Sequence, residues 1–104
     1  MNNKLLAANL CCLALLLAGP AMAEKSSVEL GQKLFNDPTL GGSSNDKSCA
    51  SCHPNGEGME KAGAKSNLAK IINQCITGPL GGEKIDGRTV EMRSLKMYIE
   101  SLAK

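Results

Sequence analysis

The chain has 104 residues and a formal net charge of +2, with one Phe, one Tyr and no Trp. This near-neutral balance, without a basic stripe or interleaved aromatic residues, argues against a nucleic-acid-binding protein. A chain this short buries only a marginal core and commonly needs a staple, a metal or another bound group for stability.

The first 23 residues are typical of a secretory signal peptide. Lys4 supplies a positive charge, residues 5–18 are almost entirely apolar, and residues 21–23 read Ala-Met-Ala, as at a signal-peptidase site. As a helix the apolar stretch would reach about 21 Å, short of a bilayer core of about 30 Å. We therefore expect cleavage after residue 23, export to the periplasm, and no membrane span afterwards. An uncleaved membrane anchor is the alternative.

The remaining residues, 24–104, are expected to form one domain. Its first helix is predicted at 27–36, since Ser26 and Glu29 have the spacing of a capping box. A glycine-rich loop follows, and residues 47–53 are expected to form a single helical turn.

Two longer helices are predicted in the second half of the domain. Residues 65–76 place apolar side chains at helical spacing: Leu68, Ile71, Ile72, Cys75 and Ile76. Residues 89–102 do the same on one side of a final helix: Met92, Leu95, Ile99 and Leu102, with Tyr98 beside them. No stretch alternates as a strand does, so the expected fold class is all-α, small and loop-rich.

The motif that carries chemistry is Cys49-Ala-Ser-Cys52-His53. A C-x-x-C-H sequence in an exported chain indicates covalent attachment of haem c. Two thiols add across the two vinyl groups of haem, and the spacing lets one turn of backbone present both sulfurs. The adjacent imidazole then becomes the proximal iron ligand. One covalent haem c would also supply the apolar body that a core so poor in aromatic residues lacks.

Two other chemistries share these residue types. A thioredoxin-like dithiol would need a βαβ surround, which the pattern does not provide. A zinc site could combine Cys49, Cys52, His53 and Cys75, but the adjacency of Cys52 and His53 makes tetrahedral ligation awkward. Three cysteines remain after signal cleavage, and this odd number argues against a disulfide framework.

On this motif the chain resembles the monohaem class I c-type cytochromes. Gly31 and Phe35 are similar to that family's N-terminal helix pattern, and Leu95 and Tyr98 to its C-terminal helix pattern. The resemblance implies a small cytochrome c fold, with three to four helices around one covalently attached haem. It also implies that the two terminal helices cross, with the small glycine allowing their close approach.

The sixth iron ligand is left open between Met92 and Cys75. The chain has one His, so a second imidazole is excluded. Met59 lies too close in sequence to the proximal side, and Met97 falls off the apolar side of its helix. The segment 72–102 resembles thiosulfate dehydrogenases and related sulfur-oxidising cytochromes, and this resemblance implies Cys75 as the ligand. An anionic thiolate would lower the reduction potential, whereas a neutral thioether would raise it.

The predicted function is that of a periplasmic carrier that passes single electrons between transient redox partner proteins, and not that of an enzyme. The alternatives are a small sulfur-oxidation cytochrome subunit with His and Cys ligands, or a gas-binding haem protein with an open sixth position. Exposed lysines are expected either to guide an acidic partner or to be ordinary solvated surface: Lys47, Lys61, Lys65 and Lys84.

Overall fold

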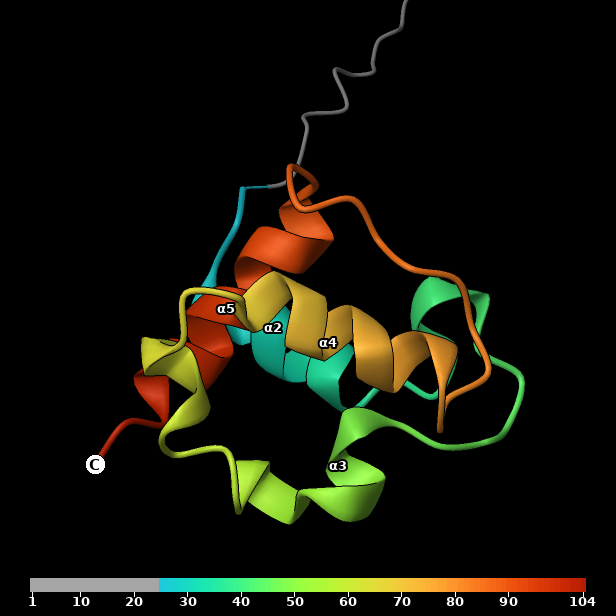
Figure 1. Cartoon of the computed structure of the whole chain (residues 1–104), viewed down its shortest axis with the longest axis horizontal. Coiled ribbons are helices and arrows are strands. Elements are labelled where there is room, and N and C mark those ends of the chain that lie inside the picture. The colour runs from blue at the N-terminus through green and yellow to red at the C-terminus, as the bar shows by residue number, and fades with distance from the viewer. Residues whose placement is uncertain (1–24) are drawn as a thin grey trace, which may run out of the picture.

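The computed structural model describes residues 25–104, so the predicted signal peptide at 1–23 lies outside the described residues. Four α-helices follow one another along the described chain (Figure 1): α2 (Val28–Phe35), α3 (Cys49–Cys52), α4 (Leu68–Thr77) and α5 (Val90–Ser101). Short 3-10 turns lie between them at Leu40–Gly42, Pro54–Gly56 and Ala62–Ala64. Residues 25–104 contain no strand, which confirms the all-α class. No helix within this range is both long and apolar enough to cross a membrane.

Side-chain caps fix where α2 and α5 begin. The Ser27 hydroxyl accepts the Leu30 N–H at 3.0 Å, and the Thr89 hydroxyl accepts the Met92 N–H at 3.1 Å. The capping box expected at Ser26 is wrong by one residue, because Ser27 is the residue with extended backbone in front of the helix. Each cap satisfies an N–H group that the first turn leaves without a partner.

Helices α2 and α5 cross at very close range, as the sequence resemblance implied. A Cβ built at Gly31 would overlap the Ser94 carbonyl oxygen and lie 2.7 Å from the Tyr98 Cβ. Next to this point, the Phe35 and Tyr98 rings meet edge to face with centroids 5.1 Å apart. The two aromatic rings of the chain therefore seal one helix crossing, and glycine is the residue that permits it.

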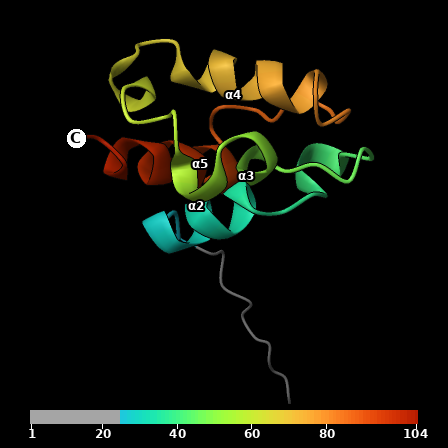
Figure 2. The same ribbon diagram turned by 90° about the horizontal axis from the view of Figure 1, so that it is seen from below.

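Helix α4 covers the opposite side of α5 from α2 (Figure 2). The apolar side chains predicted on one face of this helix differ in how deeply they are buried. Leu68, Ile72 and Ile76 are buried in the core, whereas Ile71 and Cys75 are only half-buried. The half-buried pair marks the place where the packing of α4 is incomplete.

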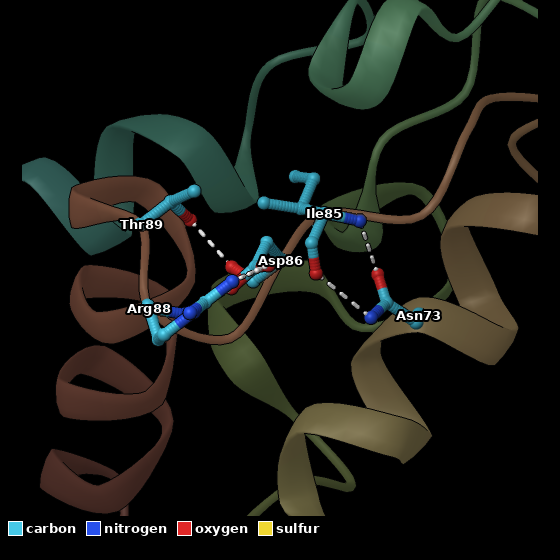
Figure 3. Close-up of polar contacts among 5 residues, drawn as sticks. All are labelled: Asn73, Ile85, Asp86, Arg88 and Thr89. Carbon is cyan, nitrogen blue, oxygen red and sulfur yellow. Dashed lines mark hydrogen bonds and ion pairs between the residues drawn. The ribbon is translucent and has the colours of Figure 1, made fainter.

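The loop between α4 and α5 is held to α4 by one amide side chain (Figure 3). The Asn73 side chain donates to the Ile85 carbonyl at 3.0 Å and accepts the Ile85 N–H at 2.7 Å. Further along, the Arg88 guanidinium pairs with both oxygens of Asp86, and the Thr89 hydroxyl donates to the Asp86 carbonyl. These contacts fix the entry into α5.

Candidate haem-binding site

A mostly apolar cavity lies where α2, α3, α4 and α5 meet, and we refer to it as the central cavity. It encloses about 90 Å³ and is lined by Phe35, Cys49, His53, Met59, Ile71, Ile72, Cys75, Leu95 and Ile99. All four helices and the segment after α3 contribute to this wall. The cavity therefore gathers predicted site residues from two distant parts of the sequence.

The single turn of α3 sends its two cysteines into different surroundings. Cys49 is 8% exposed and belongs to the core cluster, whereas Cys52 is exposed. The turn is held at both ends, since the Ser51 hydroxyl accepts the Ser48 N–H at 2.9 Å and the Cys49 carbonyl accepts the His53 N–H at 3.0 Å. One thiol thus lines the cavity and the other reaches solvent.

The hydrogen bonding of His53 fixes its tautomer. Its Nδ1 lies 2.8 Å from the Glu57 carbonyl oxygen. Because a carbonyl can only accept, the ring hydrogen lies on Nδ1, and the neutral ring keeps its lone pair on Nε2. A metal-ligating histidine is oriented in just this way by a partner on its other nitrogen. Sequence reasoning identified His53 but not the Glu57 carbonyl, which carries no side-chain signal.

The buried thiol of α3 is less acidic than an ordinary cysteine thiol. Burial raises the pKa of Cys49 to about 11, with smaller contributions from the nearby Cys75 and Cys52 thiols. Burial also raises the pKa of Cys75, and the Cys52 thiol adds to this shift. The thiols of Cys52 and Cys75 therefore lie close enough to Cys49 to contribute to its raised pKa.

The structure separates the candidates for the sixth ligand. Cys75 lines the central cavity together with His53. Met92 is fully buried in the core and does not line the cavity. Met97 is exposed, but Met59, which its closeness in sequence to His53 had disfavoured, does line the cavity. The chain folds back after α3 and brings Met59 to the cavity, which the number of residues between His53 and Met59 does not reveal.

The donor set and the lining fit a covalently attached haem. Two thiols, an imidazole with a free Nε2 and apolar walls are what such a group requires. The enclosed volume is below the roughly 300–1,000 Å³ of small-molecule pockets, so attachment requires the walls to lie further apart than here. The exposed position of Cys52 shows that a group bonded to both cysteines would reach the surface beside α3.

A metal ion held directly by side chains is not supported. Residues 25–104 contain no group of three or more His, Cys, Asp or Glu side chains placed to hold one. The three cysteines of this range are all free thiols. The zinc alternative therefore has no support in the described part of the chain.

Comparison with known proteins gives one family. The family model described as "Di-haem cytochrome c peroxidase" matches residues 25–97, which is well over half of the chain. Searches of curated proteins and of solved structures found no match. Membership of this family implies covalently bound haem c. The helical fold around the C-x-x-C-H motif is consistent with the assignment.

This match corrects one prediction. The sequence was interpreted as a carrier that is not an enzyme, and that interpretation is wrong, because the matching family is a family of peroxidases. The resemblances to monohaem class I cytochromes and to thiosulfate dehydrogenases are not confirmed. A c-type haem motif is common to carriers and enzymes, so the motif alone could not separate them.

Proposed function

This chain belongs to the di-haem cytochrome c peroxidase family, and we propose that it binds one haem c and passes single electrons through it. Cys49 and Cys52 form the thioether bonds, and His53 is the proximal ligand. When bound, the haem supplies an Fe(III)/Fe(II) couple. The observation that carries the proposal is the His53 ring, which donates Nδ1–H to a carbonyl and lines an apolar cavity beside Cys49.

Attachment uses the two thiols without an external oxidant. Each S–H would add across one vinyl group, with a sulfur–carbon bond formed and the hydrogen passed to the other vinyl carbon. Cys49 would hold the haem from the buried side of α3 and Cys52 from its exposed side. The apolar lining would contact the macrocycle, which would add to the small core of a short chain.

The proposed stoichiometry is one haem for each copy of this chain. The sequence contains one C-x-x-C-H motif and one His. Reduction of hydrogen peroxide to water takes two electrons, and a single Fe(III)/Fe(II) couple carries one. We propose that this chain receives electrons one at a time from redox partner proteins that dock briefly, for the reaction of its family.

The proposed sixth ligand is Cys75. Its thiol shares the central cavity with His53, whereas the buried Met92 lies outside that cavity. Met59 also lines the cavity, but it follows His53 by only six residues, which favours Cys75. A thiolate donor stabilises Fe(III) and keeps the reduction potential low. It also occupies the position at which peroxide would approach. An open sixth position, which would bind small gases, is the alternative outcome.

The proposal is tested on the full chain, exported in a bacterium that matures c-type cytochromes. We expect a reductive titration to consume one electron per chain and the mature protein to begin at Glu24 in the periplasm. Replacing Cys75→Ser should change the ferric spectrum and speed peroxide consumption, while Met92→Leu should leave both unchanged. An effect of Met92→Leu alone would contradict the ligand assignment, and a colourless protein would contradict the whole proposal.

A further inference from the structure

The segment that follows α3 turns back against the proximal histidine. The peptide unit between Glu57 and Gly58 has its carbonyl oxygen 2.8 Å from the His53 Nδ1. The N–H of the same peptide unit donates to the Glu60 carboxylate, at 3.1 Å from Oε1 and 3.3 Å from Oε2. One peptide unit therefore joins a carboxylate to the imidazole.

Gly58 is required for this arrangement. Its φ of +88° lies in the region that favours glycine, and a Cβ there would lie 3.2 Å from the His53 Nδ1. The backbone thus packs directly against the ring, so that the position of this peptide unit and the orientation of the imidazole depend on each other.

The carboxylate is charged at neutral pH. The pKa of Glu60 is lowered from its ordinary value by hydrogen bonds from its own backbone N–H and from that of Gly58, with smaller contributions from Lys104 and His53. A negative acceptor on the N–H polarises the peptide unit and makes its carbonyl a stronger acceptor, since hydrogen bonds in a chain reinforce one another. The Glu57 carbonyl, as a stronger acceptor, then strengthens the hydrogen bond that His53 Nδ1–H donates to it.

We propose that Glu60 is a positioning residue that orients His53 and strengthens its donation to iron through the peptide unit 57–58. The inference rests on the proposed function, in which His53 is the proximal ligand. A partner on the far nitrogen raises the basicity of a ligating imidazole, and a stronger donor stabilises Fe(III). Glu60 therefore lowers the reduction potential of the haem without touching it.

The test measures the midpoint potential of the haem-loaded full chain in Glu60→Gln, Glu60→Ala and Glu57→Gln. Glutamine keeps an acceptor but no charge, so we expect its redox equilibrium to shift about threefold toward Fe(II), or ~30 mV for a one-electron couple. Alanine leaves the Gly58 N–H without this partner and should shift the equilibrium further. Glu57→Gln is the matched control, because it removes the same charge from the same turn but keeps the backbone carbonyl.

A second measurement follows the proton on His53 Nδ1 by nuclear magnetic resonance. We expect its resonance to move in both Glu60 variants and to stay in place in Glu57→Gln. Equal potential shifts in Glu57→Gln and Glu60→Gln would overturn the inference, since charge alone would then explain them. Unchanged potentials in red, haem-loaded Glu60 variants would overturn it too, while a wild-type chain without haem would overturn the proposed function instead.

Discussion

The α2–α5 crossing and the central cavity are neighbouring regions that differ in how tightly they are packed. At the crossing, Gly31 and the Phe35–Tyr98 ring pair bring the two helices into direct contact. The central cavity is lined by two half-buried side chains that can bind a metal, those of His53 and Cys75, and its walls are incompletely packed. Side chains of the protein fill the crossing, whereas the cavity leaves space beside His53 and Cys75 for a bound group.

The largest expected difference concerns the two thiols of α3 in the haem-free chain. Cys49 is buried with a pKa raised from 9.0 to about 11, whereas Cys52 is exposed. Two pKa units lower the thiolate fraction of Cys49 about a hundredfold below that of an ordinary thiol at pH 8, and only the thiolate reacts. Iodoacetamide labelling followed by peptide mass spectrometry should therefore find the exposed Cys52 modified much faster than the buried Cys49.

The pH dependence of this difference has a definite sign. Between pH 9 and 11 the folded state keeps the Cys49 proton that the unfolded state loses, so this group's contribution to stability falls as pH rises. Labelling in urea provides the control, because unfolding should make the two rates similar. Equal rates in the folded chain would show that Cys49 does not lie inside the cavity wall.

Next in size is the effect of a methyl group at the crossing. Gly31→Ala would push a Cβ against the Ser94 carbonyl and the Tyr98 side chain, neither of which can move without displacing a helix. Overpacking of this kind costs about 1–3 kcal/mol, which urea unfolding monitored by circular dichroism can measure. Gly87→Ala is the matched control, since a Cβ there meets nothing within 4 Å. Similar midpoints for the two variants would contradict the close crossing.

A smaller effect is expected where Asn73 holds the loop before α5. Asn73→Ala removes both hydrogen bonds to Ile85 and leaves partly buried backbone groups without partners. The expected loss is about 1–2 kcal/mol in the free energy of unfolding. Asn67→Ala serves as the control, because that exposed side chain caps no N–H of α4. If both variants unfold at the same urea concentration, the loop is not held in this way.

The smallest effect is expected for the exposed ion pair in that loop. Arg88 and Asp86 are in contact at 2.9 Å, but both side chains are largely in solvent. Exposed pairs add little to stability, because water and salt screen them. Arg88→Ala should therefore unfold with wild-type behaviour in calorimetry at moderate salt. A clear loss of stability would mean that this pair contributes more than an exposed ion pair normally does.

The regions also differ in how well the sequence predicts them. The helix pattern and the C-x-x-C-H motif could be recognised because each depends on local spacing or a distinctive residue, whereas the close crossing at Gly31 was implied only by the resemblance to class I cytochromes. The Glu57 carbonyl and the Glu60 carboxylate could not, since their roles depend on how the chain turns back after α3. Met92 and Cys75 were indistinguishable in sequence for a related reason, because both lie on apolar helix faces and only tertiary packing decides which one reaches the cavity.

The most direct test of covalent haem attachment is the intact mass of the exported chain, measured beside its visible spectrum. We expect a red protein whose mass exceeds that of residues 24–104 by one haem, with the added mass on the peptide that contains Cys49 and Cys52. Replacing both cysteines by serine should abolish the added mass and the colour together. A mature wild-type chain with the mass of its amino acids alone would contradict the account.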